Sequence, residues 1–194
     1  MKDEQKKKLS KKEINGKKHQ HWVIWVTVGT FLSTIVITYI SDTLLTHTNL
    51  VFSLILLFVI IALGIFTDII GIAVASVTID PFNAMAAKKI KGAKTAVNLV
   101  KNAPRVSNVC NDVIGDICGI VSGAIVVNIA AQLVAHYPLL NASILSLASS
   151  AAVACLTVGG KAFGKDIAMQ NGTAIVHGIA VPVATVKMMF KGQE

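Results

Sequence analysis

The sequence predicts an all-α integral membrane protein with four transmembrane helices, and three observations support this class. Of 194 residues, 54% are hydrophobic and only 14% are charged, whereas a soluble domain usually carries about 25% charged residues. Four apolar stretches are long enough to cross a bilayer, which takes about 20 helical residues. All 18 Lys and Arg residues lie in segments that this topology places on one side. We therefore expect a multi-pass protein of the cell membrane.

The distribution of basic residues predicts the orientation. Eight lie between Lys2 and Lys18, six between Lys88 and Arg105, and four between Lys161 and Lys191. Loops rich in Lys and Arg stay on the cytoplasmic side, so both termini are expected inside. The net charge of +8 is then expected to attract the chain to the anionic surface of the lipid bilayer rather than to a nucleic-acid partner.

The N-terminal part of the chain is expected to form a tail and one membrane helix. Residues 1–20 are rich in Lys and predict a polar cytoplasmic tail. The first span covers residues 22–40, and Trp22 and Trp25 lie where interfacial anchors are common. Residues 21–49 thus comprise this helix and a short outside loop.

The second span, residues 50–78, is longer than a straight helix needs. It contains Thr67-Asp68 and Gly71, so we expect a tilt or a local break near these residues. An amphipathic helix over 81–102 should follow on the inner leaflet, because Asp80-Pro81 is a helix start and lysines alternate with apolar residues after it.

The remaining spans are predicted at residues 106–134 and 139–158. Gly159-Gly160 is expected to break the fourth span at the inner surface. Residues 166–190 predict an interfacial amphipathic helix. A fifth crossing is the alternative for this segment, but it would place Lys187 and Lys191 outside.

Acidic residues within the spans are the candidate functional residues, because charges at membrane depth are costly unless they face protein, water or an ion. Asp68 lies in the second span, and Asn108, Asp112 and Asp116 share a spacing of four in the third, with Asn111 on the flank. Neighbouring carboxylates repel unless a cation or proton lies between them. Such an oxygen-rich surface suits Mg²⁺ or another divalent cation.

Two further sets of residues bear on this hypothesis. Lys161 and Lys165 are either inner-face anchors or charge partners that neutralise the aspartates, in which case the acids hold the helices together. Gly115, Gly119 and Gly123 form a ridge of small residues, which predicts close packing against another span or a second copy of the chain.

Enzymatic signatures are weak, and we expect no enzyme. The chain has no P-loop, dinucleotide fingerprint or HExxH pair, and its cysteines, Cys110, Cys118 and Cys155, are interpreted as packing residues. Intramembrane aspartyl proteases also place two aspartates on different membrane helices. Their Gly-x-Gly-Asp signature would require Gly at position 113, where this chain has Val113, so this remains a remote alternative.

The order of segments resembles the membrane domain of the CNNM/CorC (CorB/CorC) family over residues 50–190. The matching stretches are Thr67 to Val77, for a kinked first helix, and Ala86 to Lys94, for a basic juxtamembrane helix. Asn111 to Asp116 matches a Gly-Asn-x-x-x-Asn pattern, with Asp112 and Asp116 replacing both Asn residues. Gly160 to Ala168 and Asn171 match the third family helix, with Lys161 in place of an acid.

The resemblance implies a homodimer that binds or transports a divalent cation, Mg²⁺ in relatives, in an inward-facing cavity. By similarity, Asp68, Asp112 and Asp116 would line it. The helix of residues 22–40 would be an addition to the family domain, and the CBS-pair module that often follows would be absent. The competing hypothesis is a non-transporting membrane partner or regulatory subunit, in which Lys161 pairs with Asp68 or Asp116.

Overall fold

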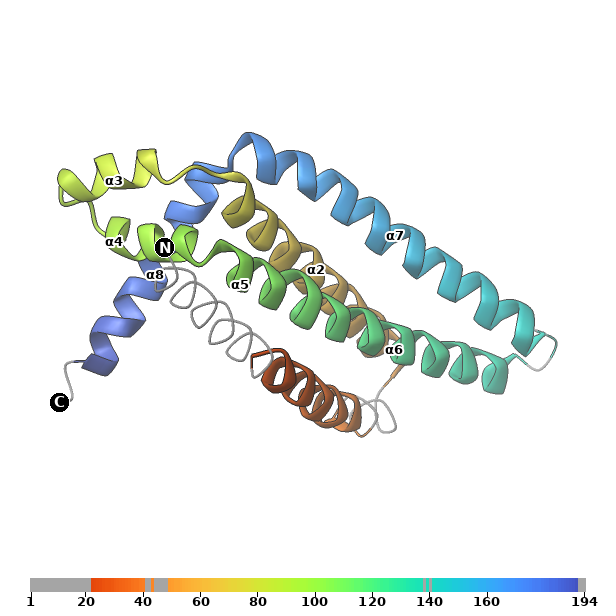
Figure 1. The fold of residues 1–194 in the computed structure, drawn as a ribbon. Coiled ribbons are helices and arrows are strands. Elements are labelled where there is room, and N and C mark those ends of the chain that lie inside the picture. Colours follow the sequence, from red (N-terminus) through yellow and green to blue (C-terminus); the bar gives the residue numbers. More distant parts are fainter. Residues whose placement is uncertain (1–21, 41–42, 44–48, 138, 140, 192–194) are drawn as a thin grey trace, which may run out of the picture.

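A computed structural model describes residues 22–40, 43, 49–137, 139 and 141–191, with side chains as far as residue 185. The described residues are organised as helices (Figure 1). Four of these are long and apolar enough to cross a membrane, namely Trp22–Ile40, Leu50–Ser76, Ala103–His136 and Ala142–Gln170. The predicted class, an all-α membrane protein, is confirmed. The predicted tail, residues 1–20, lies outside the described residues.

The first span has one sheltered face and a broad exposed surface. The partly buried positions recur every fourth residue, at Trp22, Val26, Thr30, Thr34 and Thr38, so they share one side of the helix. Thr30 and Thr34 donate hydrogen bonds to backbone carbonyls one turn earlier, at 2.8 Å. The rest of the helix surface exposes large side chains that suit lipid, including Trp25, Phe31 and Tyr39.

Helix α2 (Leu50–Ser76) is the central element, because it contacts α6 (Gly115–His136), α7 (Ala142–Gln170) and most of the other helices. Leu57 and Ile61 of α2 pack into a core whose other buried members come from α6: Ile117, Val121, Ile125, Val126 and Ile129. Of the two expectations for this span, the local break near Asp68 is wrong, since α2 continues to Ser76, whereas the tilt stays a prediction. The third span packs against the glycines of α2, because a Cβ on Gly64 or Gly71 would meet Cys118 or Asn111.

The predicted helix over 81–102 is corrected to two helices, α3 (Asp80–Ala87) and α4 (Ala93–Lys101). Helix α3 ends in a Schellman arrangement, in which the Ile90 N–H donates to the Met85 carbonyl at 3.1 Å. Lys89 (φ 57°) and Gly92 (φ 85°) both take left-handed backbone conformations in the turn. This reversal lets the two short helices pack on each other.

The third span is built from α5 (Ala103–Asn108), a π-helix η1 (Val109–Ile114) and α6. The helical run of 34 residues begins three residues before the predicted span and ends two residues after it. No pattern in the sequence predicted the π-helix. Single π turns within α-helices are rare and occur frequently at functional sites.

Helix α7 corrects the prediction for the fourth span. It begins at Ala142, where the Asn141 side chain accepts hydrogen bonds from the Ser143 and Ile144 N–H groups at 3.0 and 3.3 Å. It then runs through Gly159-Gly160 to Gln170, so these glycines do not break it. The last helix, α8 (Gly172–Lys191), starts at residue 172 rather than 166.

A second core lies where α2 and α7 end. It joins Ala73 and Val74 of α2 to buried residues of the surrounding helices, Phe82, Ala96, Ala168, Val176 and Ala180. Helices α3, α4 and α8 gather at this end of the bundle (Figure 1). Helix α8 packs on α4 and the end of α2, and His177 Nε2 lies 3.1 Å from the Lys91 carbonyl oxygen. We call this the basic end, because it carries Lys88 to Arg105 and Lys161 to Lys191.

Candidate functional site

Asp68, Lys161 and Gly115 lie near one depth of the bundle. At 1.5 Å per residue, Asp68 is roughly 27 Å along α2 from Leu50, and Lys161 is roughly 29 Å along α7 from Ala142. Gly115 is roughly 32 Å from His136, at the other end of α6. A hydrocarbon layer is about 30 Å thick. These residues therefore lie about one hydrocarbon thickness from the opposite ends of their helices, toward the basic end.

Lys161 and Asp68 form an ion pair between α7 and α2. The Lys161 Nζ lies 3.7 Å from Asp68 Oδ1, and the side chains are 28% and 14% exposed. This separation is beyond the range of a direct hydrogen bond, so the attraction is mainly electrostatic. The low polarity of the surroundings strengthens that attraction relative to a pair in water. The acid at membrane depth is thus neutralised within the chain.

Lys161 also contacts the third span. A Cβ placed on Gly115 would lie 3.3 Å from Lys161 Nζ. Gly115 is buried, and the absence of a side chain there leaves room for the ammonium group. The position of the ammonium therefore depends on all three helices, α2, α6 and α7.

Asn111 of η1 faces α2 one turn from Asp68. Its Nδ2 donates to Ser107 Oγ at 3.3 Å, but its Oδ1 is buried without a hydrogen-bond partner. This oxygen occupies the notch at Gly71, where a Cβ would overlap it. A buried amide oxygen without a donor carries a desolvation cost of about 1–3 kcal/mol. We refer to Asp68, Gly71, Asn111, Gly115 and Lys161 as the polar seam.

The remaining predicted site residues lie outside the seam. Asn108, Asp112 and Asp116 are exposed, since a spacing of four predicts a shared helix face but not the direction in which that face points. Lys165 is exposed as well. Among the residues that the structure describes, no three His, Cys, Asp or Glu side chains come together as a group that could hold a metal ion. The seam brings together Asp68, Asn111 and Lys161, and leaves the other two aspartates on the outer surface of the span.

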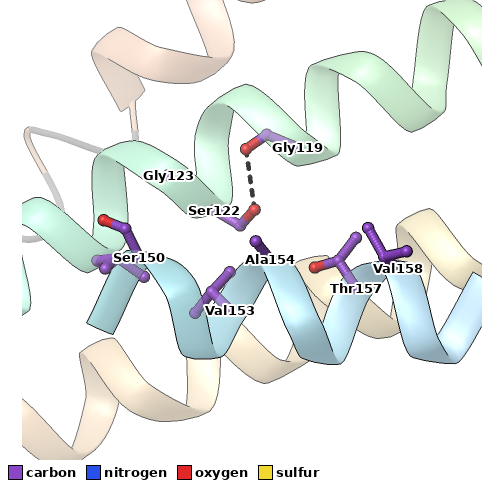
Figure 2. Close-up of a pocket in the computed structure, with 9 residues that line it drawn as sticks. Gly119, Ser122, Gly123, Ser150, Val153, Ala154, Thr157 and Val158 are labelled. Atoms are coloured by element: carbon purple, nitrogen blue, oxygen red, sulfur yellow. Dashed lines mark hydrogen bonds between the residues drawn. The ribbon is translucent and has the colours of Figure 1, made fainter. Parts of the chain in front are cut away.

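The glycine ridge of the third span makes less contact than predicted. A Cβ on Gly119 or Gly123 would meet no described atom within 4 Å, so the expected packing against another span of the same chain is wrong at these positions. Both line an open groove of about 230 Å³ between α6 and α7. Figure 2 shows this groove, in which Ser122 Oγ donates to the Gly119 carbonyl at 2.9 Å.

Four other glycines, Gly64, Gly71, Gly160 and Gly164, allow the helices to approach one another, a role that was not predicted from the sequence. A Cβ on Gly64 would lie 3.0 Å from Cys118 Cβ, and one on Gly160 or Gly164 would overlap Ile65 or Ile69 of α2. Together with Gly71, these residues hold the seam helices close. The spacings of seven on α2 and four on α7 place each pair near one helix face, which was a detectable signal.

Comparison with family models, with curated proteins and with solved structures gives no match. The fold and the seam together define a multi-pass helical membrane protein with charged residues inside its bundle.

Proposed function

We propose that the chain binds and moves a divalent cation such as Mg²⁺ through the polar seam, with Lys161 taking the place of the cation in the described state. The observation that carries this proposal is a mostly buried carboxylate, Asp68, held beside a positive charge. The buried Asn111 Oδ1 adds a second oxygen without a donor one turn away. Carboxylate and amide oxygens are ligands that Mg²⁺ accepts.

In this proposal, Lys161 acts as a tethered counter-charge. An arriving cation would compete with the ammonium group for Asp68, and the flexible lysine side chain could withdraw toward the basic end. Asp112 and Asp116 would attract cations to the seam, since exposed carboxylates raise the local cation concentration.

A homodimer in the cell membrane, with both termini in the cytoplasm, belongs to the same proposal. Asp112 and Asp116 are exposed close to the apolar layer, and carboxylates facing lipid would be costly. A second copy could cover them and enclose water between the two surfaces.

Cation flux into proteoliposomes tests the proposal. We expect Mg²⁺ flux by the native chain, a severe loss in Asp68→Asn, and a reduced rate in Asp116→Ala. Asp80→Asn is the matched control, because Asp80 is exposed at the start of α3 and away from the seam. Equal flux in the native and Asp68→Asn proteins would contradict the proposed role of the seam.

The second candidate is a non-transporting membrane partner, favoured by the same Lys161–Asp68 pair. In this candidate the internally neutralised seam holds the helices together, and the outer surfaces bind another membrane protein. This candidate predicts a stoichiometric partner on purification and no thermal stabilisation by Mg²⁺. Mg²⁺-dependent stabilisation that is lost in Asp68→Asn would exclude it.

A further inference from the structure

An open groove runs along the bundle between α6 and α7. The hollow of about 230 Å³ in Figure 2 lies between residues 119–126 of α6 and 150–158 of α7. A second hollow of about 450 Å³ continues it outward, between residues 127–135 and 142–146. At 1.5 Å per residue, the groove is roughly 24 Å long. A Cβ on Gly119 or Gly123 would meet no described atom within 4 Å, so the described part of the chain does not fill this groove.

Two carboxylates mark the inner end of the groove. Asp116 shares a face of α6 with Gly119 and Gly123, and Asp112 lies one turn further toward the basic end. Both aspartates are exposed, and neither has an ion-pair partner among the residues that the structure describes. Carboxylates that face lipid are costly. The occupant of the groove should therefore bring positive charge to its inner end.

The first span, Trp22–Ile40, has the length, depth and charge that the groove requires. It is roughly 28 Å long. It exposes two small residues one turn apart, Gly29 and Ser33, and a Cβ on Gly29 would meet no described atom within 4 Å. In the proposed topology Gly29 lies roughly 10 Å along the helix from its cytoplasmic end at Trp22. The sequence places Lys17 and Lys18 just before this end.

The groove presents its small residues at a matching depth. Gly119 and Gly123 lie roughly 6 and 12 Å from the start of α6. Helix α6 and the first span both run outward from the cytoplasmic side in the proposed topology. A parallel arrangement would accordingly bring the small residues of both helices together.

We infer that the groove between α6 and α7 binds the first span of a second copy of the chain. Small residues on both surfaces let the helix backbones approach closely. Lys17 and Lys18 then provide the counter-charge for Asp112 and Asp116, as Lys161 does for Asp68. The inference rests on the homodimer of the proposed function, but not on the movement of a cation.

The connection to the rest of the chain allows this exchange. Residues 41–49 join the first span to α2, and at about 3.3 Å per residue they can reach across roughly 30 Å. Two copies related by a two-fold axis along the membrane normal can therefore exchange their first spans reciprocally.

Cross-linking between two differently tagged, co-expressed chains tests the inference. Native cysteines are replaced by Ser in both chains, at Cys110, Cys118 and Cys155. One chain carries Gly29→Cys and the other Gly123→Cys. We expect oxidation to give a product with both tags, because a disulfide requires Cα atoms within about 7 Å of each other. Phe31→Cys in place of Gly29→Cys is the matched control, because Phe31 is exposed about 200° around the helix from Gly29. Its yield should be several-fold lower.

Three results would overturn the inference. The first is no product that carries both tags. The second is a disulfide that forms only within one chain when that chain carries both cysteines. The third is preferential linkage of two Gly123→Cys chains to each other, which would place α6 of the second copy in the groove.

Filling the groove provides a second measurement. Gly123→Leu should lower the fraction of dimer in lipid bilayers several-fold, as measured by single-molecule photobleaching. The open space around Gly123 accommodates the leucine without disturbing the fold of one copy. Gly178→Leu on α8, which also has open space, is the matched control. Equal dimer fractions for the two variants would contradict the inference.

The two proposals can fail separately. Chains that cross-link as expected but do not move Mg²⁺ would retain the interface and contradict the proposed cation function. Mg²⁺ flux without a cross-link between the first span and the groove would retain that function and overturn the interface.

Discussion

Two glycines of the membrane helices have opposite surroundings, although both lie in the interior of a span. Gly71 faces the Asn111 amide oxygen, whereas Gly119 faces open space. Alanine is more favourable than glycine in a helix interior by up to about 1 kcal/mol. The environment of each glycine therefore decides whether its replacement by alanine stabilises or destabilises the protein.

We predict that Gly71→Ala destabilises the protein by about 1–2 kcal/mol, because overpacking typically costs about 1–3 kcal/mol and the helix propensity gain offsets only part of it. Gly119→Ala should be neutral or stabilising. Thermal unfolding in detergent measures both changes. Equal effects of the two substitutions would show that Asn111 does not occupy the notch at Gly71.

The Lys161–Asp68 pair gives a second prediction. Lys161→Met leaves the Asp68 carboxylate, which is 14% exposed, without its counter-charge. Removing one partner of a fully buried pair costs about 3–5 kcal/mol, and the partial exposure of Lys161 reduces this to about 1–3 kcal/mol. Lys165→Met, at an exposed position on the next turn, should change stability by less than about 0.5 kcal/mol. The double variant Lys161→Met with Asp68→Leu should recover most of the loss, as measured by the same unfolding transition.

At the scale of helices, composition predicts the four spans well, since length and hydropathy are local properties. The failures occur where packing overrides local signals. The pair Gly159-Gly160 predicted a helix end. Helix α7 nevertheless continues, because Ile65 and Ile69 of α2 pack on Gly160 and Gly164. A glycine pair in a sequence does not show whether another helix fills the space beside it.

The candidate site was also predicted only in part from the sequence. Because charges within membrane spans are costly, the sequence predicted Asp68 as a site residue and Lys161 as a possible charge partner. The structure places these two residues together. The separation of Asp112 from the seam could not be predicted, because a spacing of four gives a shared face but not its direction. The π-helix adds one residue to a turn, and no local pattern in Val109 to Ile114 indicates it.

The turn between α3 and α4 gives a prediction about α8. Gly92 has φ 85°, and a Cβ there would lie 2.9 Å from Val181 Cγ2 and 3.0 Å from the Val181 backbone nitrogen. Gly92→Ala should therefore strain the turn and loosen α8 from it. Gly178→Ala is the control on α8, because that position has open space around it. We expect faster proteolysis within α8 for Gly92→Ala only, and equal digestion rates would contradict the described contact.

At the scale of the whole molecule, the charge distribution predicts which end lies in the cytoplasm. Lys88→Cys marks the basic end and His136→Cys the opposite end, and both positions are exposed. In intact cells, a membrane-impermeant thiol reagent should label His136→Cys only. Lys88→Cys should react after the cells are opened. The reverse pattern would invert the proposed topology and the inward direction of the seam.

The two separate cores have a consequence for how the molecule opens. The core around Leu57 and Val121 joins α2 to α6, whereas the core around Phe82 and Val176 joins the short helices to the ends of α2 and α7. Cooperative units of a protein can unfold independently when few buried contacts connect them. The assembly of α3, α4 and α8 is accordingly the part of the molecule that can loosen while the core between α2 and α6 stays packed.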